Sequence, residues 1–221
     1  MNEKEYDVCK YHIVTTLYDS YDRQQKCKET ISSIYPNFDG KVNFYYSSKT
    51  NNKKFKFLNV FDNYLCDQMS IDMYNRPGSY GCSTSYLYSI RLAKSLDWPY
   101  VFIFEDDILI NSEIRNLKYY VDNTNYDFYF IVLGYWGKKL KFKKINDYFK
   151  LYSRGQIGGG HDMFIPKKSY DILLNILYKK LFIRDGLYTI PLFQPKILYP
   201  NIKMVSLSGC CNESVIGRRY Q

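Results

Sequence analysis

Three acidic residues, Glu105, Asp106 and Asp107, directly follow the apolar run 100–104. A continuous apolar run of this length predicts a strand that is buried on both faces of a sheet. Adjacent carboxylates raise one another's pKa unless a positive charge lies between them. Oxygen ligands without His or Cys beside them suit Mg²⁺ or Mn²⁺, which bridge to substrate phosphates. The pattern therefore predicts a divalent metal site at the end of this strand, and the competing interpretation is a solvated acidic turn.

Side chains of an extended chain point alternately to its two faces. If the chain stays extended through the three acids, Asp106 lies on the opposite face from its two acidic neighbours. Glu105 and Asp107 are therefore expected on one face and Asp106 on the other. With this arrangement one carboxylate can reach a metal while another meets the ribose or sugar of a nucleotide sugar.

The elements that must position these acids follow from the spacing of apolar residues. Strand-length runs alternate with segments that place apolar residues three and four positions apart. The expected strands are 12–17, 42–46, 57–61, 100–104 and 128–133. Four helices are expected, with the apolar faces Cys27, Ile31 and Ile34; Leu87, Ile90 and Ala93; Ile114, Leu117 and Val121; and Tyr170, Leu173, Leu174 and Leu177. Ser112 is expected to cap the third of these helices. This order predicts an α/β sandwich with a mainly parallel central sheet, in which ligands bind at the carboxyl ends of the strands. No linker divides the chain, so residues 1–221 are expected to form a single domain.

The 221 residues include 31 Lys or Arg against 22 Asp or Glu, a formal net charge of +9. This excess favours an anionic partner, which can be nucleic acid, phospholipid or a phosphate-bearing small molecule. Lysines are concentrated in the stretch 138–144, where they alternate with Leu140 and Phe142. Three interpretations compete: a solvated edge strand protected by lysines, a landing surface for an anionic acceptor or a membrane, and a nucleic-acid-binding segment. A basic nucleic-acid-binding protein explains the charge but not an acidic cluster at a strand end.

Hydrophobic residues make up 46% of the sequence, which excludes a wholly disordered chain. The first residues contain no apolar signal-peptide segment, and the longest apolar stretch, 128–136, is about half as long as a membrane span. The six cysteines include no Cys-x-x-Cys pair, which favours free thiols in a reducing compartment. We therefore expect a soluble cytoplasmic protein, in the host cytoplasm if its source is a virus. It should have no membrane span, although peripheral contact with a membrane is open.

Two segments, 81–86 and 102–107, together resemble the hallmark of glycosyltransferase family 25. They read Gly-Cys-Ser-Thr-Ser-Tyr and Phe-Ile-Phe-Glu-Asp-Asp, with a helix-length segment between them. Family members typically read Gly-Cys-x-x-Ser-His, a helix, and a strand that ends in Glu-Asp-Asp. Because Tyr86 stands in place of the family's His, a catalytically silent sugar-nucleotide-binding protein is an alternative to the enzyme.

The resemblance extends in order and spacing over most of the chain. The first strand and Tyr21-Asp22-Arg23 resemble the family's opening, and the segment 160–166 with its following helix resembles a later part. Asp185 and Leu198-Tyr199-Pro200 fall where the family has an Asp and then a Tyr-Pro. The family includes bacterial lipooligosaccharide galactosyltransferases and collagen hydroxylysine galactosyltransferases.

The resemblance implies a GT-A-like (Rossmann-like) fold and an inverting transfer of a hexose, galactose or glucose, from a UDP-sugar to a hydroxyl of a glycan, lipooligosaccharide or glycoprotein acceptor. It implies Mn²⁺ or Mg²⁺ as the cofactor, with Asp107 as the direct metal ligand and Asp106 in support of the metal or the ribose. Glu105 is expected to assist at this donor site. Arg23 is expected to meet the diphosphate or uracil, and His161 the metal or a phosphate.

An inverting displacement also needs a base that takes the proton of the acceptor hydroxyl. Asp162 and Asp185 are the two candidates. Asp162 is favoured because the glycines 158–160 before it are expected to form a turn that lets a ligand approach the backbone closely. Simpler interpretations stand beside each role: a turn or helix cap for either Asp, a surface position for His161 and a solvated helix start for Arg23.

Overall fold

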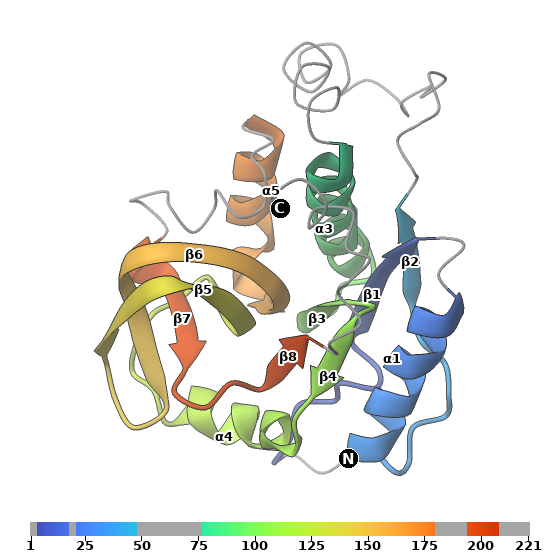
Figure 1. The fold of residues 1–221 in the computed structure, drawn as a ribbon, viewed down its shortest axis with the longest axis horizontal. Coiled ribbons are helices and arrows are strands. Elements are labelled where there is room, and N and C mark those ends of the chain that lie inside the picture. The colour runs from blue at the N-terminus through green and yellow to red at the C-terminus, as the bar shows by residue number, and fades with distance from the viewer. Residues whose placement is uncertain (1–3, 18–20, 48–76, 180–193, 208–221) are drawn as a thin grey trace.

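The computed structural model describes residues 4–17, 21–47, 77–179 and 194–207 (Figure 1). Along the chain the strands and α-helices are β1 (His12–Leu17), α1 (Tyr21–Ile34), β2 (Phe44–Ser47), α3 (Pro77–Ser95), β3 (Tyr100–Glu105), β4 (Ile108–Ile110), α4 (Leu117–Asp122), β5 (Phe130–Lys144), β6 (Phe149–Pro166), α5 (Tyr170–Lys179), β7 (Ile197–Pro200) and β8 (Val205–Leu207). The expected strand 57–61 lies outside the described residues.

Six strands form the main sheet in the order β2-β1-β3-β6-β5-β7, and β4 pairs with β8 separately. β1 runs parallel to both β2 and β3, and β5 runs parallel to β7, whereas β6 is antiparallel to its neighbours. The α/β prediction is confirmed, and the parallel arrangement holds for β2-β1-β3. β5 and β6 run in opposite directions because only residues 145–148 join them, and so short a connection makes consecutive strands antiparallel.

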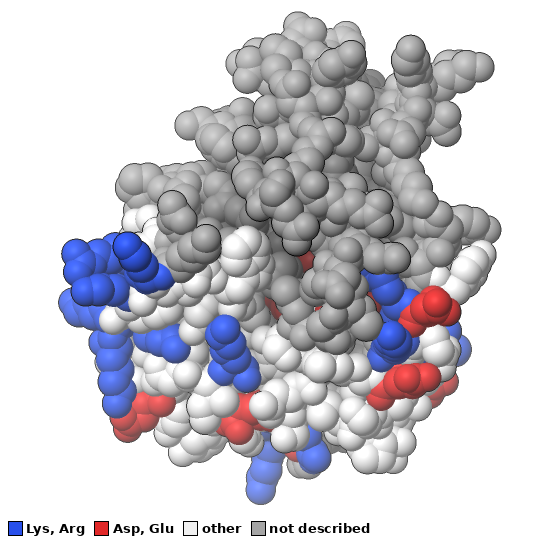
Figure 2. All heavy atoms as spheres, viewed as in Figure 1, with Lys and Arg blue, Asp and Glu red and all other residues white. Residues whose placement is uncertain are grey.

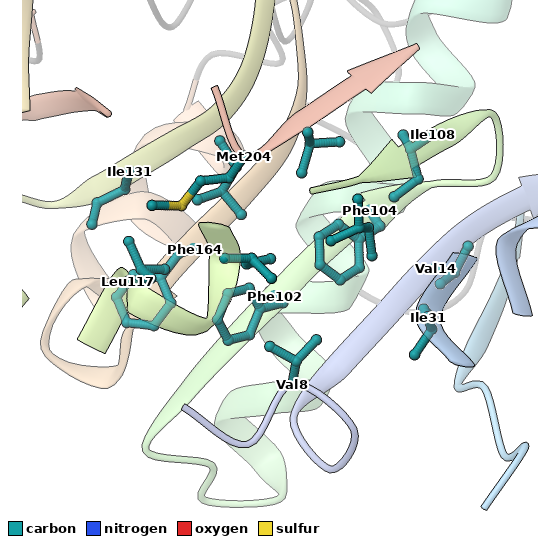
Figure 3. Packing of buried hydrophobic residues seen from close by; sticks show 14 of the residues in the cluster. Val8, Val14, Ile31, Phe102, Phe104, Ile108, Leu117, Ile131, Phe164 and Met204 are labelled. Carbon is teal, nitrogen blue, oxygen red and sulfur yellow. The ribbon is translucent and has the colours of Figure 1, made fainter. Parts of the chain in front are cut away.

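The strand β3 contributes to two cores, one on each face of the sheet. Val101 and Ile103 pack with residues of α3 and α5, while Phe102 and Phe104 pack with residues of α1 and α4. Figure 3 shows the second core, in which side chains of β1, β3, α1 and α4 meet. The four side chains of residues 101–104 are fully buried, as the apolar run predicted, whereas Tyr100 and Glu105 at the two ends of β3 are half-buried. Packing on both faces fixes where β3 ends, and with it the position of the acidic segment.

The helices beside the candidate site follow the predicted spacing. α1 buries Cys27 and Ile31, and α3 buries Leu87, Ile90 and Ala93.

Among the described residues, Cys9 and Cys27 are free thiols. No helix within the described ranges is both long enough and apolar enough to cross a bilayer.

The segment 112–122 begins with a 3-10 turn that is capped by Asn111, not by the predicted Ser112. The Asn111 side chain accepts a hydrogen bond from the backbone N–H of Glu113 at 2.9 Å. Asn111 has the extended backbone of a capping residue, with φ −93° and ψ 146°, whereas Ser112 already belongs to the turn.

The predicted turn at residues 158–160 is wrong, because these glycines and Asp162 lie within the strand β6. β5 pairs with β6 along this stretch and places Trp136 opposite Gly158, and Gly134 opposite Asp162. The register shifts between these two pairs, which marks a bulge in the ladder. The lysine-rich stretch 138–144 forms the second half of β5.

Candidate active site

The candidate site lies where the parallel strands β1 and β3 end side by side. The register places Thr15 of β1 opposite Glu105, the last residue of β3. The hydroxyl of Thr15 donates a hydrogen bond to the carbonyl oxygen of Phe104 at 3.1 Å. Since the carboxyl ends of parallel strands meet at one edge of a sheet, Thr16 and the acids after Glu105 come together there.

Arg23 in the first turn of α1 brings a positive charge to this edge. Its Nη2 contacts Oδ1 of Asp106 and lies 3.1 Å from Oδ2 of Asp107. The two carboxylates are buried, whereas 33% of the Arg23 side chain is exposed. One guanidinium therefore neutralises part of the negative charge of two adjacent carboxylates, and its exposed part remains accessible from solvent.

Asp106 is held by two different elements. Its Oδ1 contacts Arg23 of α1, and its Oδ2 accepts a hydrogen bond from the hydroxyl of Thr16 at the end of β1. Burial raises the pKa of the Asp106 carboxyl to about 6, while Arg23 and Thr16 act in the opposite direction. Both carboxylate oxygens are thus engaged by protein groups.

Asp162 reaches the same edge from β6. It is fully buried, and its Oδ1 accepts a hydrogen bond from the backbone N–H of Glu105 at 3.4 Å. Gly134 lies directly opposite it on β5. A Cβ atom on Gly134 would lie 2.8 Å from the carbonyl oxygen of Val205, closer than real Cβ atoms come, and 3.0 Å from Oδ2 of Asp162, closer than most of them come. The missing side chain of Gly134 therefore makes room for the Asp162 carboxylate.

The fit of a divalent metal can be tested on these side chains. Within the described ranges no three His, Cys, Asp or Glu side chains form a group that could hold a metal ion. Asp106 gives its two oxygens to Arg23 and Thr16. A hard cation needs several oxygen ligands. In this arrangement the described residues do not fit Mn²⁺ or Mg²⁺, and Arg23 provides positive charge beside the two carboxylates.

The structure brings together five of the residues expected from the sequence: Arg23, Glu105, Asp106, Asp107 and Asp162. The predicted separation of Asp106 from Asp107 on opposite faces is wrong, because both contact Arg23. The extended chain of β3 stops at Glu105, and the two Asp residues form the turn that leads to β4. Alternation along a strand therefore does not apply to them.

Three further residues named from the sequence, Asp185, His161 and Tyr86, are not placed at this site by the described structure. Asp185 and the side chain of His161 lie outside the described residues, and the backbone of His161 is part of β6. Tyr86, which stands where the family has His, is 2% exposed and belongs to the core between α3 and the sheet. Its ring is therefore a packing element.

Two residues of the site were not predicted from the sequence. Thr16 is the last β-branched residue of β1, and its position near the strand end was the available signal. Gly134 interrupts the apolar run of β5 between Leu133 and Tyr135, which is typical of a close approach by another group.

No protein-family model matches the chain, and no curated protein matches it significantly. Among solved structures, the chain is similar to the crystal structure of a glycosyltransferase involved in the glycosylation of the major capsid of PBCV-1. The two chains are 12% identical, with a TM-score of 0.42, and the match covers 85% of this chain and 79% of the other. A TM-score this low does not support a function for this chain.

Proposed function

We propose that this protein is a glycosyltransferase that moves a hexose, galactose or glucose, from a UDP-sugar to a hydroxyl of a glycan, lipooligosaccharide or glycoprotein acceptor. The observation that carries the proposal is the meeting of Arg23, Asp106, Asp107 and Asp162 at the carboxyl end of β3. This is the edge of an α/β sheet where ligands bind. It is also the segment whose sequence resembles glycosyltransferase family 25.

The proposed reaction is an in-line displacement with inversion at the anomeric carbon of the donor sugar. The acceptor oxygen forms the new bond to that carbon while the bond to the UDP oxygen breaks, and UDP leaves with the bonding electrons. The acceptor hydroxyl loses its proton to a carboxylate base. Negative charge grows on the departing diphosphate and needs a positive group beside it.

Arg23 is the proposed partner of the donor diphosphate. A third of the Arg23 side chain is exposed, whereas the carboxylates of Asp106 and Asp107 that it contacts are buried. Guanidinium groups bind phosphate oxygens through several N–H donors at once. A diphosphate that approaches this edge would meet Arg23 from the solvent side, and the two Asp residues would keep the guanidinium in position from below.

Asp162 is the proposed base, and Asp185 is the competing candidate. The hydrogen bond from the Glu105 N–H ties the Asp162 carboxylate to the end of β3. Asp162 is fully buried, so an acceptor hydroxyl reaches it only when the groups that cover it move. The donor diphosphate can therefore reach Arg23 without this movement, whereas the acceptor hydroxyl cannot reach Asp162 without it.

Dependence on Mn²⁺ or Mg²⁺ remains a prediction from the sequence resemblance, since the described side chains do not fit a metal ion. Thermal unfolding with UDP, in the presence of Mn²⁺ or of excess chelator, tests it. A ligand that binds the native state alone raises the melting temperature. If the metal is needed, only UDP with Mn²⁺ produces a large increase. An equal increase with chelator would show that Arg23 and its neighbours hold the donor without a metal.

The enzymatic proposal has its own test in a screen of donors. UDP-galactose, UDP-glucose, UDP-N-acetylglucosamine and GDP-sugars are incubated with the protein, and release of the nucleoside diphosphate is measured. Turnover of one UDP-hexose supports the proposal. Binding of UDP without release of the nucleoside diphosphate from any donor identifies a sugar-nucleotide-binding protein instead. If the protein neither binds UDP nor turns over any donor, the proposed donor site is overturned.

A further inference from the structure

The second half of β5 and the first half of β6 form a two-stranded ribbon with cationic side chains on its outside. Lys139, Lys141 and Lys143 of β5 and Arg154 of β6 are exposed. These four residues are named the cationic ribbon. Figure 2 shows Lys and Arg side chains that project from the left edge of the molecule, where the ribbon lies in Figure 1.

The charges of the cationic ribbon have no acidic partner among the described residues. Lys141 lies directly opposite Arg154 in the ladder, and like charges in directly opposed positions are destabilising. The segment 136–156 contains one acidic residue, Asp147, whose carboxylate accepts a hydrogen bond from Lys144 at 2.7 Å. None of the four ribbon residues forms an ion pair with another described residue. Repulsion that no described acidic residue compensates is consistent with an anionic partner outside the chain.

Trp136 adds an apolar component to this surface. It lies on β5 three residues before Lys139, and 53% of it is exposed. Lysines alone are explained by protection of an exposed strand edge, but protection does not explain an exposed tryptophan beside them. Tryptophan is enriched at the boundary between lipid and water, where its ring contacts apolar groups and its N–H stays hydrated.

We propose that the cationic ribbon and Trp136 form a docking surface for an anionic lipid bilayer. Lysine is a flexible point charge, which suits a diffuse layer of headgroups. Proteins that bind single-stranded nucleic acid combine stacking aromatic residues with a positively charged groove. Lys and Arg side chains instead project from the molecular edge in Figure 2. A pocket among the described residues lies between α3 and α5, and its lining, which includes Arg91 and Asp171, contains no residue of the cationic ribbon. The proposal does not depend on glycosyl transfer.

The test measures binding of the full chain to vesicles of phosphatidylcholine with and without phosphatidylserine. Each cation near an anionic bilayer strengthens partitioning roughly fivefold. The ribbon variant Lys141→Gln/Lys143→Gln/Arg154→Gln should therefore partition roughly 10²-fold more weakly into vesicles that contain phosphatidylserine. Binding should also weaken when salt rises from roughly 0.1 M to 1 M, because the Debye length shortens from about 10 Å to 3 Å.

A matched control removes the same number of charges elsewhere. Lys10→Gln/Lys28→Gln/Lys41→Gln also lowers the net charge from +9 to +6 (9 − 3), but these residues lie near β1, α1 and β2, at the far end of the strand order. The control should bind vesicles almost as well as the unmodified protein. An equal loss in both variants would overturn the proposal, because the overall charge and not the ribbon would then determine binding.

Fluorescence provides a second readout that does not depend on charge removal. Trp98→Phe leaves Trp136 as the single tryptophan of the chain. Its emission should shift to shorter wavelength when vesicles with phosphatidylserine are added, because the ring leaves water. If saturating vesicles cause no shift, Trp136 does not contact the bilayer, and that part of the proposal is overturned. Binding of a mixed-sequence oligonucleotide through the same residues, without binding to vesicles, would overturn the membrane assignment in favour of nucleic acid.

Discussion

At the carboxyl end of β3, Arg23 lies against the buried carboxylates of Asp106 and Asp107, whereas Lys141 in the cationic ribbon faces Arg154 across two strands. Burial of a charge costs several kcal/mol unless an opposite charge or hydrogen bonds compensate, so the first arrangement requires its partners. Exposed like charges are screened by water and salt, so the second arrangement is tolerated at small cost. The comparison separates buried charges, which the fold must pair, from exposed charges, which are available to an external partner.

The largest expected effect concerns sugar transfer and tests whether the buried acids act in catalysis as well as in structure. Asp162→Asn keeps the size of the side chain and a carbonyl oxygen that can accept from Glu105, but removes the base. Transfer from the active donor should fall by roughly 10²–10⁴-fold, the usual contribution of general base catalysis. UDP binding should be unchanged.

Asp185→Asn is the control for this measurement and should transfer sugar normally. If Asp185→Asn loses transfer and Asp162→Asn retains it, the base is Asp185. If both variants remain active, neither residue is the base, and Asp162 has only a structural role at the end of β3.

The next effect is on stability. Arg23→Gln leaves the buried Asp106 and Asp107 without the guanidinium that compensates them. The free energy of unfolding should fall by about 2–3 kcal/mol, somewhat less than for a fully buried pair because Arg23 is partly exposed. Urea unfolding measures the change. Lys144→Gln, which removes an exposed pair with Asp147 at the end of β5, is the control and should cost less than about 0.5 kcal/mol. Equal losses in the two variants would remove the distinction between the regions.

Gly134→Ala tests the space that the buried carboxylate of Asp162 occupies. The new Cβ would meet Oδ2 of Asp162 and the backbone of Val205, and backbone cannot move aside as a flexible side chain can. We expect a loss of about 1–3 kcal/mol in the free energy of unfolding, the usual cost of overpacking. Transfer should fall as well, because Asp162 is displaced. Unchanged stability would show that β5 and β6 adjust freely at this bulge.

The smallest effect lies in the cationic ribbon and has the opposite sign. Lys141→Glu replaces a repulsive cross-strand pair with an attractive one opposite Arg154. The free energy of unfolding should rise by about 0.2–1 kcal/mol. Lys143→Glu, opposite Leu151, is the control and should change stability by less than about 0.5 kcal/mol. Destabilisation by Lys141→Glu would mean that the lysine has a stabilising partner.

Much of the fold was predictable because its signals are local. The apolar run of β3 and the helical spacing of α1 and α3 depend on burial, which sequence patterns record directly. The acids were predicted to follow the carboxyl end of a buried strand, and they do. The contact of Arg23 with both Asp residues was not predictable, because it depends on how α1 packs against the end of β1 and on where β3 stops.

The course of β6 shows a different limit. A run of three glycines favours a turn by intrinsic propensity, yet pairing with β5 keeps the chain extended through them. Tertiary context therefore overrides the local signal at 158–160. The same pairing brings Gly134 opposite Asp162, a relation between distant residues that no local pattern encodes.

The strand order also affects how the chain folds while the ribosome synthesises it. β3 is complete at residue 105, but its neighbour β6 is complete only at residue 166, a difference of 61 residues (166 − 105). At roughly 5–20 residues per second, ribosomes need about 3–12 s for this stretch, during which one edge of a strongly apolar strand has no partner. A stalled nascent chain that ends near residue 145 should therefore bind a holdase chaperone more strongly than the completed chain does, and equal binding would show that another segment covers the edge of β3 first.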